Sequence, residues 1–256
     1  MIPETGSVVE NTTPSRAAEQ NTTEETASEN SQGLSLRIAI DPGHGFGDNG
    51  SGSLYLPQYE QYYTMLIANS LKEKLEGYGA QVVLTHDGDS YPSEDELYSK
   101  GKNYGIFDKY PLLANGIEYN DNLFNKYERM ICANALYAEN EFDLYVSIHL
   151  NSYEEDDSVC GTEIYYCNTN TFASKIKSVF TPFCEEVQSG GISKYASLVG
   201  TDFNESYVST KYCQFASVLV ECAYMSNPDE AKNIAGSEWR DKFTSMLAAT
   251  IVEGFN

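Results

Sequence analysis

From about residue 34 to its end, the chain alternates between short apolar runs and longer segments of helical periodicity. Apolar side chains that recur every three or four residues predict amphipathic helices. Apolar runs of four to eight residues between turn signals predict buried strands. Strands are predicted at 36–41, 80–85, 143–150, 161–166 and 217–220, with an edge strand at 192–199. Helices are predicted at 58–78, 93–101, 123–139 and 172–188, after Asn227, and from Ser237 onward.

This alternation of strands and helices predicts an α/β fold. We expect one domain at 34–256, with a mostly parallel, mixed and twisted sheet of about six strands that is covered by helices on both faces. Residues 102–120 are turn-rich and weakly patterned, so 88–122 is interpreted as an enlarged loop or insertion. In folds of this kind, active sites gather beyond the carboxyl ends of the strands.

Residues 1–33 contain almost no large apolar side chain, and we interpret them as a disordered Thr/Glu/Asn/Ser-rich linker. They lack the apolar core of a signal peptide, so an export signal or anchor is not visible in the sequence. No apolar stretch of the chain approaches the ~20 residues of a membrane span.

The chain is strongly acidic, with a formal net charge of −22. The first 33 residues carry six acids and Arg16, which is −5, so −17 remains on the predicted domain. This charge argues against a nucleic-acid-binding protein, which needs a basic face, and gives no support for docking on an anionic membrane. Six cysteines are scattered without CxxC spacing; Cys132 and Cys222 are predicted to be buried, and Cys160 and Cys167 are placed where they could pair.

Two of the three histidines, His44 and His149, end strand-like runs. Together with Glu60, near the start of a predicted helix, they make the ligand set of an open catalytic zinc site. The alternatives are ordinary loop histidines that form hydrogen bonds, and a first-turn glutamate favoured by the helix dipole.

Glu221 ends the fully apolar run 217–220 and is the candidate general base and acid. A carboxylate in such a place is costly to bury unless it is paired or functional, so a structural ion pair is the alternative. His86 is expected at the surface or behind the ligands, and the acidic run 154–157 in a solvated loop. Glu163 is interpreted as an exposed strand acid, with support of a histidine's orientation as the alternative. Asn134, Asn151 and Ser152 are weaker candidates for orienting the site or the substrate.

Several motifs occur in order and resemble the zinc-dependent N-acetylmuramoyl-L-alanine amidases of the amidase-3 family. They are Ile-Asp-Pro-Gly-His-Gly at 40–45, Glu60, Arg-x-x-x-Ala-Asn at 129–134, Ser-Ile-His-Leu-Asn at 147–151, Gly-Thr-Glu at 161–163, and Val-Glu-Cys-Ala-Tyr-Met-Ser-Asn-Pro-Asp-Glu at 220–230. The resemblance covers residues 36–255. Phe46, His86 and Ala223-Tyr224 depart from the family pattern without removing a ligand.

The resemblance implies a Zn²⁺ ion held by His44, Glu60 and His149, with Glu221 activating the metal-bound water. It implies peptidoglycan as the substrate, cut at the amide between the lactyl group of N-acetylmuramic acid and L-alanine of the stem peptide. We therefore expect an extracellular enzyme of the bacterial cell wall, acting as a monomer. The alternatives are a non-catalytic wall-binding or regulatory module, and a zinc peptidase that cuts within the stem peptide.

Overall fold

The computed structural model describes residues 35–45, 47–88, 92–118, 126–202 and 207–256. The tail predicted at residues 1–33 lies outside the described residues. So do residues 119–122, at the end of the predicted insertion, and 123–125, where a helix was predicted to begin.

Within the described residues, six strands form one sheet in the order β2-β1-β3-β6-β4-β5. Strands β1, β2, β3 and β6 are parallel to one another, whereas β4 pairs antiparallel with β6 and parallel with β5. The predicted mixed α/β sheet is thus confirmed, and the expected edge strand does lie at an edge. The bounds are β1 Arg37–Pro42, β2 Gln81–Leu84, β3 Leu144–Asn151, β4 Thr162–Cys167, β5 Ala196–Thr201 and β6 Ala216–Tyr224.

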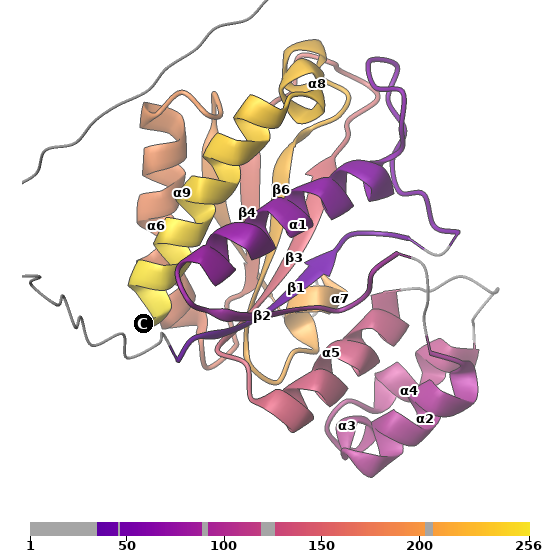
Figure 1. Ribbon diagram of the computed structural model, residues 1–256. Coiled ribbons are helices and arrows are strands. Elements are labelled where there is room, and N and C mark those ends of the chain that lie inside the picture. The colour runs from indigo at the N-terminus through magenta and orange to yellow at the C-terminus, as the bar shows by residue number, and fades with distance from the viewer. Residues whose placement is uncertain (1–34, 46, 89–91, 119–125, 203–206) are drawn as a thin grey trace, which may run out of the picture. The chain divides into compact units, whose positions relative to one another are not determined.

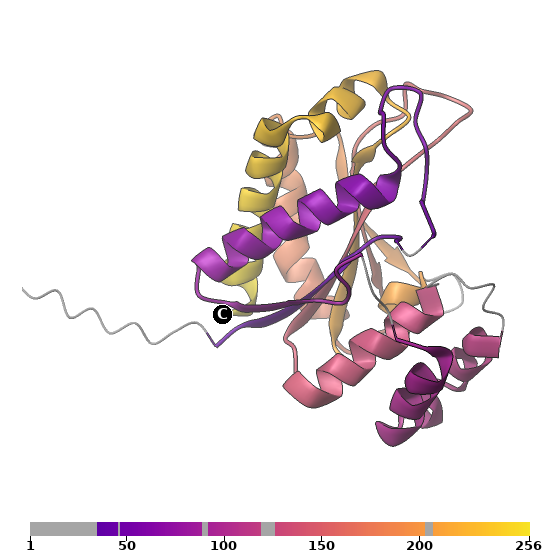
Figure 2. The same cartoon turned by 45° about the vertical axis from the view of Figure 1, so that its right-hand side comes forward.

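Helices cover both faces of this sheet (Figures 1 and 2). Helices α1, α6 and α9 pack on one face, and α5 and α7 on the other, with α2, α3 and α4 packed outside α5. The bounds are α1 Glu60–Gly77, α2 Glu94–Asn103, α3 Ile106–Lys109, α4 Pro111–Glu118, α5 Lys126–Asn140, α6 Ala173–Ser189, α7 Val208–Lys211, α8 Pro228–Ala235 and α9 Ser237–Phe255.

The two helical layers give the sheet a hydrophobic core on each face. Successive side chains of a strand point to opposite faces. Ile38 and Ile40 therefore join the core beneath α1 and α9, whereas Ala39 joins the core beneath α5. Every residue of β6 is buried, as expected of a central strand covered on both sides.

The described part of the segment predicted to be turn-rich, residues 102–118, is mostly helical, which corrects that interpretation. Ser93 caps α2 as its sequence predicts, but α2 continues to Asn103, and α3 and α4 follow it. Helices of four and eight residues present only one or two apolar side chains to a core, so they show little periodicity in the sequence. Leu97, Ile106 and Leu113 are each buried against this core.

Two further expectations can be compared with the structure. All six cysteines, which lie in the described part of the chain, have free thiols, and Cys132 and Cys222 are buried as predicted. Over the described residues, no helix combines the length and apolar character that crossing a membrane requires.

The packing of α4 can be tested with two neighbouring leucines. Leu113 is fully buried, whereas Leu112 is 55% exposed. We expect Leu113→Ala to lower the free energy of unfolding by about 2–4 kcal/mol, because it leaves a cavity in the core. The matched control Leu112→Ala should change it by less than about 0.5 kcal/mol. Urea denaturation followed by circular dichroism measures both; equal effects would contradict the packing of α4 on this core.

Candidate metal centre

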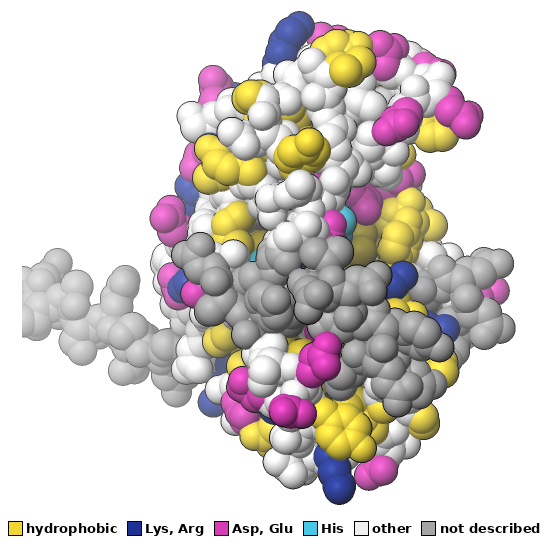
Figure 3. All heavy atoms as spheres, turned by 90° about the vertical axis from the view of Figure 1, so that its right-hand side faces the viewer, with side chains coloured by type: hydrophobic (Ala, Val, Ile, Leu, Met, Phe, Trp, Pro, Cys, Tyr) yellow, Lys and Arg dark blue, Asp and Glu magenta, His cyan; other side chains and the backbone are white. Residues whose placement is uncertain are grey.

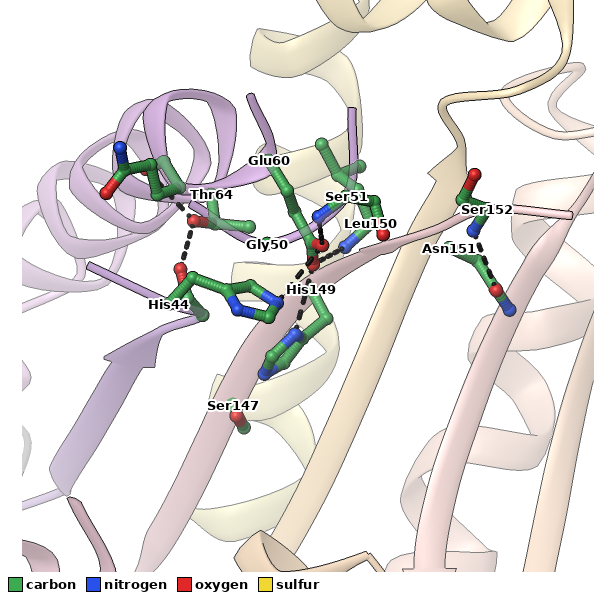
Figure 4. Close-up of polar contacts among 12 residues, drawn as sticks. His44, Gly50, Ser51, Glu60, Thr64, Ser147, His149, Leu150, Asn151 and Ser152 are labelled. Carbon is green, nitrogen blue, oxygen red and sulfur yellow. Dashed lines mark hydrogen bonds and ion pairs between the residues drawn. The ribbon is translucent and has the colours of Figure 1, made fainter. Parts of the chain in front are cut away.

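Three predicted site residues come together at the carboxyl edge of the parallel strands (Figure 4). His44 follows β1, Glu60 is the first residue of α1, and His149 lies near the end of β3. One ligand atom from each of the three lies within 4.8 Å of the others. In the described part of the chain, this group of His and Glu side chains lies close enough together to share a metal ion.

The Glu60 carboxylate is the centre of this group and is 3% exposed. Its Oε2 lies 3.1 Å from His44 Nε2, and its Oε1 lies 3.1 Å from His149 Nδ1. The backbone N–H groups of Ser51 and Leu150 each donate a hydrogen bond to it at 3.0 Å. These two bonds join the loop before α1 and the end of β3 to the same side chain.

The backbone around the histidines leaves no room for larger residues. His44 itself has φ +67°, a left-handed conformation that is uncommon for residues other than glycine. A Cβ on Gly43 would lie 2.7 Å from the His149 ring, and one on Gly50 would lie 2.6 Å from the His44 ring. The glycines therefore allow the chain to pack directly against both imidazoles.

The charges of the three side chains are coupled. For His44, burial acts to lower the pKa, but hydrogen bonds with Asp48 and Glu60 raise it to about 9. Burial lowers the pKa of His149 despite its contact with Glu60. Burial alone would raise the pKa of Glu60, but hydrogen bonds with His149 and His44 hold it well below its usual range. The group thus contains an ionised carboxylate between two imidazoles.

Asp48 also contacts this group and was not predicted from the sequence. Its Oδ2 lies 2.8 Å from His44 Nδ1, and its Oδ1 accepts a 3.0 Å hydrogen bond from the Gly50 N–H. Carboxylates commonly hold the second ring nitrogen of a metal-binding histidine in this way. The signal available in the sequence was an Asp four residues after His44 in a Gly-rich loop, which is weak by itself.

A buried ion pair lies beneath the histidines. Asp41 is fully buried and lies 3.2 Å from Arg129 Nη2, and it also accepts hydrogen bonds from Thr85 and Ser147. Arg129 Nη2 is also 3.5 Å from His149 Nε2. Arg129 therefore connects α5 to the end of β1 and to the second histidine.

Glu221, the predicted proton carrier, lies beside His149 in the sheet, where the two are register partners on β6 and β3. The residue is 9% exposed, and its buried Oε2 has no hydrogen-bond partner in the structure. Burial raises the pKa of the Glu221 carboxyl to about 8; the nearby Glu60 and Glu163 carboxylates add to this shift, and His44 opposes it. This is the property of a group that can accept and release a proton near neutral pH.

The weaker candidates have other places in the structure. His86 is 8% exposed, so it is not a surface residue, and its Nε2 lies 2.7 Å from the Pro42 carbonyl behind His44. Asn134 is fully buried; its side chain donates a hydrogen bond to the Tyr212 carbonyl and accepts one from the Gln214 N–H. Its role is therefore to hold α5 against the chain segment before β6. Glu163 is half-buried rather than freely exposed and accepts a hydrogen bond from Asn151.

A cavity of about 950 Å³ is lined by residues near Glu60 and His149 in the sequence, but not by the three candidate ligands themselves. It lies between the loop that leads into Glu60 and the loop that follows β3, and Ser226 also lines it. The acidic residues 154–157 line it and are exposed, as predicted for a solvated loop. Figure 3 shows histidine atoms in a recess of this face, with acidic and hydrophobic side chains around them.

The donor set fits a divalent metal ion. Two imidazoles and one carboxylate are suited to metals such as zinc and leave further coordination positions for water or substrate. The adjacent Glu221 adds a carboxyl group whose proton affinity is raised. This arrangement can polarise a carbonyl group and move a proton at a nearby atom.

Known proteins that resemble this chain in sequence and those that resemble it in fold belong to the same group. The family described as N-acetylmuramoyl-L-alanine amidase (Amidase_3) matches residues 38–253. N-acetylmuramoyl-L-alanine amidase LytC of Bacillus subtilis (strain 168) is 26% identical over 214 residues, which is 82% of this chain and 34% of that protein. The probable cell wall amidase LytH of Staphylococcus saprophyticus is 25% identical, over 84% of this chain and 54% of that protein. The chain thus spans a third to a half of the length of these relatives.

Two solved structures have the same fold. The CwlD amidase of Clostridioides difficile, solved in complex with the GerS lipoprotein, has a TM-score of 0.64 at 23% identity. That alignment covers 86% of this chain and 98% of that chain. Ami1 of Mycobacterium smegmatis has a TM-score of 0.61 at 17% identity, and the alignment covers 88% of this chain and 99% of that one.

The orientation of His44 by Asp48 can be tested by metal affinity. Asp48→Asn removes the negative charge beside Nδ1, so we expect the affinity for a divalent metal ion to fall about tenfold. Competition with a chromophoric chelator measures this affinity. Asp95→Asn, on exposed helix α2, makes the same chemical change away from the site and should leave the affinity unchanged. Equal affinities in the two variants would contradict the role of Asp48.

Proposed function

The chain belongs to the N-acetylmuramoyl-L-alanine amidase family, and from this premise we propose that it is a peptidoglycan hydrolase. The bond cleaved is the amide between the lactyl group of N-acetylmuramic acid and L-alanine of the stem peptide. The observation that supports this most is the buried, unpartnered oxygen of Glu221 next to the His44, Glu60 and His149 group. A protein that only binds the wall does not need a carboxyl group in that position.

The metal in this proposal is Zn²⁺, held by His44, Glu60 and His149. These side chains fit it, because each has a ligand atom within 4.8 Å of the others and the set has the composition of open zinc sites. When bound, zinc would polarise a carbonyl oxygen and increase the acidity of a water molecule. Asp48 would hold the His44 ring in place, and the N–H groups of Ser51 and Leu150 would hold Glu60.

In this mechanism, Glu221 moves the proton. Its carboxylate accepts a proton from the attacking water and then delivers it to the nitrogen of the departing L-alanine. Burial in an apolar strand raises the pKa of this carboxyl to about 8, which suits it to holding the proton between the two steps. The cavity bordered by the loop before α1 and the loop after β3 offers space for a polymeric substrate.

The proposed place of action is the bacterial cell wall, outside the cytoplasmic membrane. Two of the relatives reported above are named as amidases, and one of them as a probable cell wall amidase.

Metal dependence and bond choice are tested together on purified sacculi. The zinc-loaded protein is expected to release stem peptides with free L-alanine amino termini and to leave the glycan intact. Removal of the metal with a chelator should abolish this release, and added Zn²⁺ should restore it. Mass spectrometry identifies the fragments. Peptides cut internally would instead identify a zinc peptidase, and wall binding without any release would identify a non-catalytic module.

The role of Glu221 is tested by Glu221→Gln, which keeps the shape of the side chain but removes its basic oxygen. We expect the cleavage rate to fall by a factor of about 10²–10⁴, because proton transfer is lost. The zinc content, measured by atomic emission, should stay at that of the wild type, since Glu221 is not a ligand in this proposal. Loss of zinc in parallel with activity would contradict the assignment.

A further inference from the structure

A second carboxylate lies next to Glu221 on the side away from the metal-site histidines. In the sheet, Glu221 on β6 is the register partner of His149 on β3 and also of Glu163 on β4. Directly paired residues of neighbouring strands project from the same face of a sheet. The three side chains therefore form a row across β3, β6 and β4, with Glu221 in the middle.

Glu163 is held firmly in this position. Its Oε2 accepts hydrogen bonds from Asn151 Nδ2 at 2.9 Å, from the Tyr165 hydroxyl at 2.9 Å and from the Tyr224 hydroxyl at 3.1 Å. These three donors come from β3, β4 and β6. Glu163 is half-buried, so a ligand bound at this edge of the sheet can reach it.

In the part of the chain that the structure describes, no lysine, arginine or histidine forms a salt bridge with the Glu163 carboxylate. The hydrogen bonds that Glu163 accepts come from a neutral amide and two neutral phenols. The row therefore contains two carboxyl groups and lacks a lysine or arginine partner for Glu163. Such a place suits a cationic ligand that can form a hydrogen bond to a carboxylate.

The proposed reaction makes such a cation at this point. Hydrolysis breaks the C–N bond; the hydroxyl of water joins the carbonyl carbon, and the proton carried by Glu221 joins the nitrogen. The new carboxylic acid releases its proton, and the amine of L-alanine takes up one more and becomes an ammonium ion at neutral pH. The ammonium forms next to Glu221, which is the neighbour of Glu163.

We propose that Glu163 binds the newly formed amino terminus of the stem peptide as it leaves Glu221. This inference rests on the proposed amidase function. It makes Glu163 a group that contacts the product, and it gives Asn151, Tyr165 and Tyr224 the role of positioning the carboxylate. The released peptide is then bound by its charged end, whereas the uncut substrate, whose nitrogen is a neutral amide, is not.

Calorimetric binding to the zinc-loaded protein tests this directly. The two probes are a synthetic stem peptide with a free L-alanine amino group and the same peptide with that group acetylated. Wild-type protein should bind the free amine about tenfold more tightly. Glu163→Gln, which keeps an oxygen for the three donors, should bind both peptides equally. Glu253→Gln, which removes one exposed charge from α9, is the matched control and should retain the tenfold preference.

Two outcomes would overturn the inference: a wild-type protein without preference for the free amine, or a Glu163→Gln variant that keeps it. If Glu163→Gln does not fold, a crystal structure of zinc-loaded Glu221→Gln with the free-amine peptide decides the matter. It should place the amino nitrogen within hydrogen-bond distance of Glu163, and placement elsewhere refutes the inference. Failure to release peptides from sacculi would refute the amidase function instead, and that assay is independent of the binding comparison.

Discussion

The structure depends above all on how one buried carboxylate, that of Glu60, is satisfied. A charge taken out of water is tolerated only when it is paired and hydrogen-bonded. Glu60 meets this requirement with two backbone N–H groups and two imidazoles, which come from the loop before α1, from β3 and from the second residue after β1. The bonds that stabilise the carboxylate therefore also fix the positions of the two histidines. The buried carboxylate of Asp41, at the end of β1, is likewise paired, because Arg129 forms an ion pair with it beneath the histidines.

Much of the fold was predictable because its long elements bury regular apolar patterns. The strands around Ile38 and Tyr145 and the helices α1, α5, α6 and α9 lie close to their predicted ranges, whereas β6 continues four residues beyond its predicted end at Val220. Helices α3, α4 and α7 were missed, since four to eight residues are too few to establish a period. Residues whose chemistry is unusual for their place, such as His149 and Glu221, were visible as candidates. These residues lie close to Glu60 because of the order of the strands in the sheet, and the local sequence pattern does not predict that order.

Asp48 and Glu163 show a second limit of sequence reasoning. Asp48 acts through another side chain, so its importance appears only when the His44 ring nitrogen is located. Glu163 was predicted to be an exposed strand acid rather than a group that orients a histidine, and its place in the sequence does not show which side chains surround it. The active sites of such folds lie at the edge formed by the carboxyl ends of the parallel strands. In β4, which is antiparallel to β6, it is the beginning of the strand that lies at this edge. The direction of one strand thus brings the second residue of β4 into the row with Glu221.

The acidity of the chain also affects the two halves of the proposed reaction differently. Hydrolysis would leave a new carboxylate on the glycan and a new ammonium on the peptide, at a site with Glu60, Glu163 and Glu221 in a domain whose predicted charge is −17. Like charges repel and opposite charges attract over distances of about 10 Å at moderate salt. The carboxylates of the protein therefore attract the new ammonium of the peptide and repel the new carboxylate of the glycan, whereas a bound Zn²⁺ would act on both charges in the opposite sense.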